Sequence, residues 1–303
     1  MKIEYPIGLL KEIEDLQGVY ALNGFPSKKT ELIGMHLYRY TDIEKFKNDA
    51  KEKKNVKGKV NELVFVSPVK WGDKFERRFL YTKYNNFSQK EIRCMCFTKE
   101  CFWNEEAGWK SHGFSEHSWD SCGQKDCLIL KERKQVRLKL ALWGLLSSLS
   151  KYAVENGVKI YIGEAIYGLT VKQILNLHNN GEDYHDLFFP NPMRDENFLS
   201  LMLLKRKAFL YEDEVRIFIY LNEPIDRDGS RVVNVRDISD EFFLERVKVN
   251  YKDFLKEIRL SPFFDDDSAM QAKSDLNKLF SSKIIVKRSD LYANEKDVIL
   301  DHV

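Results

Sequence analysis

The apolar positions of the chain repeat with two periods, which predict a mixture of strands and helices. Alternation with a period of two predicts strands over 34–41, 61–68, 91–98, 134–142, 158–168, 213–221, 230–237, 256–262 and 283–289. Helical spacing predicts helices over 7–22, 42–54, 143–156, 170–180, 197–209 and 265–282. Strands and helices do not alternate in a regular βαβ rhythm, so we expect the α+β fold class.

Local signals set several boundaries of these elements. Asp42 fits the N-cap of the helix that follows it, because its side chain can accept a backbone N–H of the first turn. Pro68 ends the strand before it, since proline cannot donate to the ladder. Gly157 is expected to stop the preceding helix. The segment 103–126 has no clean period and is expected to be a short helix with an irregular loop.

Composition and charge are those of a globular protein, with 43% hydrophobic residues, 32% charged residues and a formal net charge of +2. No apolar run reaches the roughly 18 residues that span a bilayer, and the first residues lack the features of a signal peptide. We therefore expect a cytoplasmic protein with no membrane partner. Because the charge is nearly balanced, binding of nucleic acid would depend on local basic stretches, namely 45–59, 131–139 and 205–207. We expect the first to be a solvated helix end and loop.

Five cysteines, an odd number, fit a cytosolic chain that keeps its thiols reduced. Cys94 and Cys96 would share one face of the strand over 91–98. The other three match no common zinc spacing, although His112 and His117 lie among them. We expect buried thiols that pack as small apolar side chains, with a metal site over 94–127 as the alternative.

The common catalytic motifs are absent: nothing matches a Walker loop, a dinucleotide GxGxxG, an HExxH helix or a GxSxG elbow. Candidate chemistry lies instead in dispersed elements. They are "LYRYT" around Arg39, "VFVSP" around Ser67, "WGDKFERR" at 71–78, and "YEDEVRI" with Glu212 and Glu214.

These elements occur in an order that resembles a known family. The series "YRYT", "LVFVSP", "GDKFE", "CMCFT", a tryptophan with "SHG", and "KRKAFLYEDEVRI" resembles a poorly characterised family of bacterial domains whose members recur among defence genes. The resemblance covers about residues 36–221. Gly72 and Lys74 stand where the family has Asn and Pro, Thr98 where it has Ser, and Phe209 where it has Trp. The Y-R-Y and E-x-E elements are intact.

The two intact elements also resemble the ends of the Arg-Ser-Glu signature of ADP-ribosyltransferases. In that signature a first strand carries an Arg that grips NAD, a second strand ends in Ser, and a later strand begins with E-x-E. The resemblance implies an ADP-ribosyltransferase-like mixed sheet with flanking helices as a core over 31–225. A helical segment over 1–30 would precede this core, and an α+β extension over 226–303 would follow it.

The resemblance also implies a role for each matching residue. Glu214 would be catalytic, and Glu212 would orient the acceptor. Arg39 would bind NAD, since its fork suits a pyrophosphate, and Ser67 would brace the site. An aromatic ring that stacks on nicotinamide could come from Tyr38, Tyr40 or Phe75. Cleavage of the bond between nicotinamide and ribose passes through an oxocarbenium-like state, which a carboxylate stabilises.

The implied function is that of an NAD-dependent ADP-ribosyltransferase, acting as a toxin or effector of a bacterial antiviral defence or toxin-antitoxin system. The acceptor would be a macromolecule, with nucleic acid (RNA or DNA) preferred over protein. Basic residues in 131–139 and 205–207 could bind phosphate, and Trp or Tyr in 103–119 could stack on bases. An antitoxin protein would be a further partner.

Each of these residues also has a plainer interpretation. The two glutamates could be a solvated strand end paired with Lys205, Arg206 or Arg216. Arg39 could be a surface residue of a strand, and Ser67 before Pro68 could be a turn residue. Two functional alternatives follow: a non-catalytic defence module that senses nucleic acid or a partner, and a metal-dependent nuclease. The nuclease would use Asp73, Glu76, Glu212 and Glu214.

Overall fold

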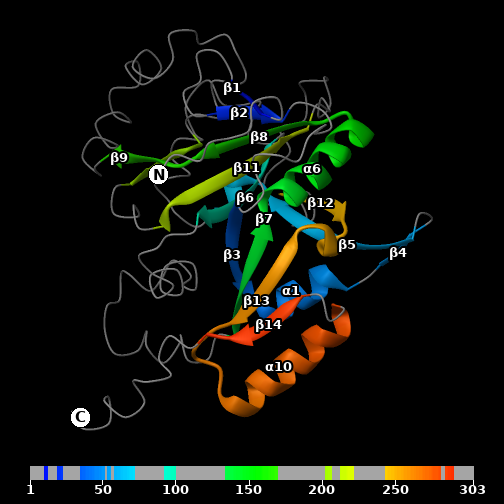
Figure 1. Ribbon diagram of the computed structural model, residues 1–303. Coiled ribbons are helices and arrows are strands. Elements are labelled where there is room, and N and C mark those ends of the chain that lie inside the picture. The colour runs from blue at the N-terminus through cyan, green and yellow to red at the C-terminus, as the bar shows by residue number, and fades with distance from the viewer. Residues whose placement is uncertain are drawn as a thin grey trace, which may run out of the picture. The chain divides into compact units, whose positions relative to one another are not determined.

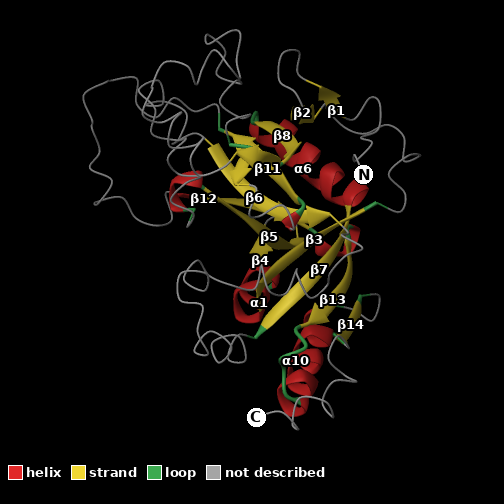
Figure 2. Ribbon diagram, turned by 90° about the vertical axis from the view of Figure 1, so that its left-hand side faces the viewer, coloured by secondary structure: helices red, strands yellow, loops and turns green. Residues whose placement is uncertain are grey.

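The computed structural model describes residues 10–12, 19–22, 35–51, 53–55, 58–71, 92–99, 134–169, 202–206, 212–221, 243–280 and 284–289. These residues form helices and mostly antiparallel strands, which confirms the α+β class (Figures 1 and 2). The chain divides into two compact units, each assembled from separate stretches. The first comprises 1–32, 63–96 and 146–247, and the second comprises 33–62, 97–145 and 248–303.

The strands of the first unit follow the order β1-β2-β8-β11-β6. Their bounds are Leu10–Glu12 for β1, Val19–Leu22 for β2, Lys159–Glu164 for β8, Glu214–Tyr220 for β11 and Ile92–Lys99 for β6, whose last three residues belong to the second unit. Strand β5 (Gly58–Val66) pairs β6 through Val66 and Cys94, and β12 (Leu244–Val249) pairs β5. Strands β9 (Ile166–Leu169) and β10 (Leu204–Arg206) form a separate parallel pair.

Strand β11 lies between β8 and β6 in this unit. Its residues from Glu214 to Ile219 are all buried, and its antiparallel register with β8 runs from Val215–Glu164 to Tyr220–Lys159. A strand that is buried on both faces is apolar along its length, so the ionic residues at its start need partners inside the protein.

The strands of the second unit follow the order β6-β3-β7-β13-β14. Their bounds are His36–Asp42 for β3, Gln135–Ala141 for β7, Leu255–Leu260 for β13 and Ile285–Arg288 for β14. Strand β4 (Lys53–Asn55) forms a hairpin with the first residues of β5. The helices are α1 (Ile43–Ala50), α10 (Asp266–Leu279) and the start of α6 (Leu142–Asn156), with short 3-10 turns at Tyr251–Asp253 here and Pro68–Lys70 in the first unit.

The core of the second unit follows from the alternation of β7. Val136, Leu138 and Leu140 are buried, while the residues between them are half-buried. Helix α1 contributes Phe46, whose ring lies 5.6 Å from both Phe280 after α10 and Tyr251, so one aromatic cluster joins the two helices and the 3-10 turn.

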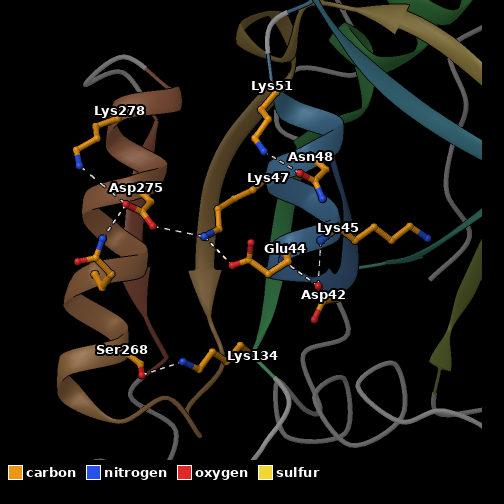
Figure 3. A network of polar contacts seen from close by, with 11 residues as sticks. Asp42, Glu44, Lys45, Lys47, Asn48, Lys51, Lys134, Ser268, Asp275 and Lys278 are labelled. Carbon is orange, nitrogen blue, oxygen red and sulfur yellow. Dashed lines mark hydrogen bonds and ion pairs between the residues drawn. The ribbon is translucent and has the colours of Figure 1, made fainter.

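Polar contacts tie α1 to α10 within this unit (Figure 3). The Lys47 ammonium lies 2.7 Å from a carboxylate oxygen of Glu44 and 3.4 Å from one of Asp275. Lys134, just before β7, donates a 3.0 Å hydrogen bond to the Ser268 hydroxyl on α10. The two helices are therefore joined by a partly buried ion bridge in addition to the aromatic cluster.

Most predicted elements that fall on described residues are confirmed. The strands over 34–41, 61–68, 91–98, 134–142, 213–221, 256–262 and 283–289 correspond to β3, β5, β6, β7, β11, β13 and β14. The helices over 42–54, 143–156 and 265–282 correspond to α1, α6 and α10, although the first is wrong at 53–54, which belong to strand β4. Asp42 accepts backbone hydrogen bonds from Glu44 and Lys45, and Gly157 has a φ of 65°, so both boundary signals are confirmed.

Four predictions need correction. The helix over 7–22 is wrong at 10–12 and 19–22, which are strands β1 and β2. Pairing of β2 with β8 outweighs the helical spacing of its apolar residues. The helix over 197–209 is wrong at β10, which pairs β9 instead. The strand over 158–168 is interrupted at Ala165, because β8 and β9 join different sheets. The charged stretch 45–59 was expected to be a helix end and a loop, but it contains strand β4 and the start of β5, which form a hairpin.

Other expectations fall elsewhere. Strand β12 was not predicted, and the elements expected over 103–126, 170–180 and 230–237 lie outside the described residues.

In the described part of the chain, no helix has the length and apolar character to cross a membrane.

Candidate functional site

The two glutamates of the E-x-E element are buried in the first unit, where they form an ion cluster. Glu214 is the first residue of β11 and is 2% exposed, and Glu212 just before it is 8% exposed. The Lys205 ammonium contacts the carboxylates of both. The two glutamates are therefore not a solvated strand end. Their predicted pairing with Lys205 and Arg216 is confirmed. The side chain of Arg206 lies outside the described residues.

Arg216 provides the other cationic contact of Glu214. Its Nε lies 3.0 Å from Oε1 and its Nη2 lies 3.1 Å from Oε2, which is the two-point geometry that a guanidinium offers a carboxylate. Its Nη1 donates to the carbonyl oxygen of Met202, and its Cζ lies 4.5 Å from the centre of the Trp71 ring. The side chain is 1% exposed. Arg216 is thus held from three sides.

Two cations and two carboxylates balance within this cluster, as burial of ionised groups requires. Lys205 lies between the glutamates, where a divalent ion bridging them would also lie. Among the described residues, no group of three or more His, Cys, Asp and Glu could hold a metal ion. The further ligands of the nuclease alternative, Asp73 and Glu76, lie outside the described residues. The Glu212–Glu214 pair by itself therefore fits an ammonium better than a metal.

The cluster holds Glu214 ionised. Burial alone would raise the pKa of this carboxyl, but Arg216 and Lys205 lower it far below its usual range. A hydrogen bond with Cys94, burial and the charge of Glu214 raise the pKa of the Cys96 thiol. Burial and the same charge raise the pKa of Tyr167, whose hydroxyl oxygen accepts a 2.9 Å hydrogen bond from the Glu214 N–H. The charged acidic group among these three is therefore the carboxylate, whereas the Cys96 thiol and the Tyr167 phenol keep their protons.

The two cysteines on β6 behave as expected for buried thiols. Both are free, Cys94 is buried, and Cys96 is half-buried with its thiol next to that of Cys94. His112, His117 and the remaining three cysteines lie outside the described residues, so the metal alternative over 94–127 stays a prediction.

A backbone turn at Asp213, rather than strand alternation, brings the two glutamates to Lys205. Asp213 has a φ of 42°, in the left-handed region, and the strand begins only at Glu214. Non-glycine residues are uncommon there, and Asp and Asn tolerate it best. The sequence pattern predicted that the two glutamates lie side by side through strand alternation, whereas the turn at Asp213 places them there.

This turn gives a testable order of stabilities at position 213. Asp213→Val should unfold at a lower denaturant concentration than Asp213→Gly, with a difference in unfolding free energy of about 1–3 kcal/mol, because a β-branched residue is strained at positive φ. At the exposed strand position Lys248, the same two replacements should reverse their order, since strands favour Val over Gly. Equal stability of the two variants at 213 would contradict the turn.

The Y-R-Y element lies on β3 in the second unit, where register separates its side chains. Tyr38 pairs with Lys139 and Arg39 pairs with Leu138 on β7. The Tyr38 ring contacts Lys139, while Arg39 shares the buried face of Leu138 and acts electrostatically on Lys45 of α1. Successive residues of a strand point to opposite faces. Tyr38 and Tyr40 therefore face away from the side on which Arg39 lies.

Ser67 directly follows β5 in the first unit and is fully buried. Its N–H donates a 2.7 Å hydrogen bond to the carbonyl oxygen of Phe243, and it precedes the 3-10 turn Pro68–Lys70. Ser67 therefore leads into a turn, as its plainer interpretation predicts, whatever other role it has. Ser67 and both glutamates belong to the first unit, and the Y-R-Y residues to the second. Phe75 lies outside the described residues.

Sequence reasoning missed two contributors to the cluster, Tyr167 and the carbonyl oxygen of Met202, and neither belongs to a motif. Tyr167 lies in a short strand whose pairing was not predicted. Trp71 begins the candidate stretch "WGDKFERR", but its contact with Arg216 was not predicted. Only the neighbouring basic stretch 205–207 pointed to Lys205, as a counter-ion.

Comparisons with known proteins give no relative from which a function could be carried over. No protein-family model matches the chain, and neither the curated proteins nor the solved structures contain a significant match. The function must therefore be argued from the residues themselves.

Proposed function

We propose that this chain is an NAD-dependent ADP-ribosyltransferase that modifies a macromolecule, with nucleic acid preferred over protein as the acceptor. The observation that carries the proposal is Glu214, a carboxylate kept ionised in a buried setting at the first position of β11. Stabilising an oxocarbenium-like state requires a full negative charge at a fixed place and with little water nearby. Arg216 and Lys205 supply the conditions under which a buried glutamate keeps that charge.

The elements that carry the three signature residues also support the proposal. Arg39 lies within β3, Ser67 directly follows β5, and Glu214 begins β11. This is the order, and these are the strand positions, that the resemblance to the Arg-Ser-Glu signature implies. Arg39 and Glu214 lie in strands that backbone pairing fixes, and the Ser67 N–H is bonded to the Phe243 carbonyl oxygen.

Within the proposal, the residues of the chain divide the work. NAD, when bound, supplies the ADP-ribosyl group and releases nicotinamide. Glu214 would face the sugar carbon from which nicotinamide departs. Glu212 would accept the proton of the acceptor hydroxyl. The Lys205 ammonium contacts both carboxylates, so it sets their separation and can yield one contact to a sugar hydroxyl.

A second candidate function is favoured by one observation. Both oxygens of Glu214 already accept hydrogen bonds from Arg216 or Lys205, which is also what a purely structural ion cluster would show. The chain would then be a non-catalytic module of a defence system that binds nucleic acid or a partner protein.

Incubation of the purified chain with NAD labelled in its adenylate part separates the two candidates. Separate pools of RNA, DNA and protein from a bacterial extract are offered, and release of nicotinamide is followed. We expect label in a nucleic-acid pool, and EDTA should not reduce this labelling. Expression of the chain in bacteria should arrest their growth, as expression of a toxin does. No nicotinamide release with any pool would refute the transferase and leave the binding module.

A further inference from the structure

The hydroxyl group of Tyr167 has a fixed position beside the backbone of Glu214. Tyr167 lies on β9, which follows β8 in the chain (Figure 1). Its hydroxyl oxygen accepts a 2.9 Å hydrogen bond from the Glu214 N–H, and the Ala165 N–H donates a 2.8 Å hydrogen bond to the Glu214 carbonyl oxygen. Residues 165 and 167 therefore hold both polar groups of the Glu214 backbone, and the Tyr167 hydroxyl is placed at the start of β11.

Strand register brings Tyr167 and Lys205 to the same place. In the parallel pair of β9 and β10, these two residues are direct partners, so their side chains share one face of the pair. The Lys205 ammonium contacts the carboxylates of Glu212 and Glu214. The two short strands thus present one ammonium and one hydroxyl to the two carboxylates.

The Tyr167 hydroxyl can still donate a hydrogen bond. A phenolic hydroxyl accepts and donates at the same time, and among the described residues none receives the hydrogen of this one. Both oxygens of Glu214 already accept from Arg216 or Lys205. Burial and the charge of Glu214 raise the pKa of Tyr167, so the hydrogen stays on the oxygen at neutral pH. A ligand can therefore receive it.

Tyr167 is also more accessible than the charged groups beside it. It is half-buried, whereas the four charged side chains of the cluster belong to residues that are at most 8% exposed. A molecule that approaches the carboxylates can thus meet the tyrosine as well. A donor next to carboxylate acceptors suits a sugar, because each sugar hydroxyl both donates and accepts.

We propose that the Tyr167 hydroxyl donates a hydrogen bond to a hydroxyl oxygen of the ribose that carries nicotinamide. This ribose then lies between Tyr167 as donor and the carboxylate of Glu214. Tyr167 is a substrate-binding residue in this arrangement, and it favours ribose over a deoxyribose, because a site built to hydrogen-bond a hydroxyl rejects an analogue that lacks it. The inference rests on the proposed function, since it names a further contact of NAD at the same site.

The test measures kcat/KM for nicotinamide release by the full chain from NAD and from its 2′-deoxy and 3′-deoxy analogues, altered in the nicotinamide ribose. Tyr167→Phe keeps the ring and removes only the oxygen, and thermal unfolding verifies that it folds. With NAD, the variant should be slower than the wild type by about tenfold. With one of the two analogues this difference should shrink to less than about twofold, because the contact is already absent.

A matched control is Tyr152→Phe, which removes the hydroxyl of another half-buried tyrosine of the first unit, hydrogen-bonded to Glu245. It should stay within about twofold of the wild type on all three substrates. The analogues are needed because Tyr167→Phe also removes the acceptor of the Glu214 N–H. A purely structural loss of that kind would slow all three substrates by the same factor.

The outcomes separate this inference from the proposed function. If Tyr167→Phe slows the release of nicotinamide from all three substrates equally, or does not slow it with NAD, Tyr167 makes no contact with the ribose and the transferase still stands. If the wild type releases no nicotinamide from any of the three, the transferase is refuted and this inference falls with it. Loss of the difference with one analogue alone supports the contact and identifies the hydroxyl.

Discussion

Glu214→Gln should lower the rate of nicotinamide release by a factor on the order of 10² to 10³. Glutamine has the shape of glutamate and keeps an oxygen that can accept from Arg216, but it has no negative charge to stabilise an oxocarbenium-like state. Lys205 would then keep its contact with the Glu212 carboxylate, and Arg216 would contact a neutral amide in place of the Glu214 carboxylate. The measurement is nicotinamide release at saturating NAD, together with thermal unfolding to verify that the variant folds.

Two further variants make this result specific. Glu245→Gln removes a charge from a half-buried glutamate of the same unit, hydrogen-bonded to Tyr152, and should leave the rate within twofold. Glu212→Gln should lower transfer to the acceptor more than hydrolysis of NAD, because Glu212 is assigned to the acceptor hydroxyl. A folded Glu214→Gln variant with an unchanged rate would exclude Glu214 as the catalytic carboxylate.

Alternation within single strands was the part of the fold that the sequence could predict. Strand β7 alternates between buried and half-buried residues along its whole length, so both of its faces are readable from residues 135–141. Residues 10–12 and 19–22 show the limit: they have helical spacing, but β2 pairs with the distant strand β8, and β1 pairs with β2. Such partners are not encoded locally.

The candidate site was predictable to a similar degree. Its two carboxylates and their cationic partners Lys205 and Arg216 stand close together in the sequence, and the structure brings them together. The left-handed turn at Asp213 has no motif, because aspartate occurs in many backbone conformations. Arg137, Arg259 and Lys287 illustrate the same point: they come from three distant stretches, and only strand register shows that they form one row.

Arg216→Met should reduce the free energy of unfolding by about 3–5 kcal/mol, the largest loss of stability that we expect from a single exchange in this chain. The guanidinium is 1% exposed, binds both oxygens of Glu214 and donates to the Met202 carbonyl. Methionine fills much of the volume but leaves a buried carboxylate with Lys205 alone, and Lys205 also serves Glu212. Arg288→Met, at a more exposed arginine paired with Asp266, should cost less than about 1 kcal/mol.

Removing the carboxylate as well should restore much of this loss. In Glu214→Met/Arg216→Met, Lys205 and Glu212 still balance each other and the variant contains no unpartnered ion, so the two exchanges should be non-additive by about 2 kcal/mol in a denaturant-based double-mutant cycle. Simple addition of the two losses would mean that Arg216 stabilises the unit through packing against Trp71 rather than through the charge of Glu214.

The pH dependence separates charge from packing a second time. In the wild type, the pKa of Glu214 is lowered on folding, so its stabilising contribution is present above the pKa of the unfolded chain, about 4.3, and is lost as the pH falls below it. In Arg216→Met, burial dominates and raises that pKa, so the carboxyl destabilises the fold at neutral pH and becomes neutral, and harmless, in acid. The stability difference between the two proteins should therefore shrink as the pH falls from 7 to about 4. A difference that stays constant over this range would refute the ionic role of Arg216, because loss of packing does not depend on pH.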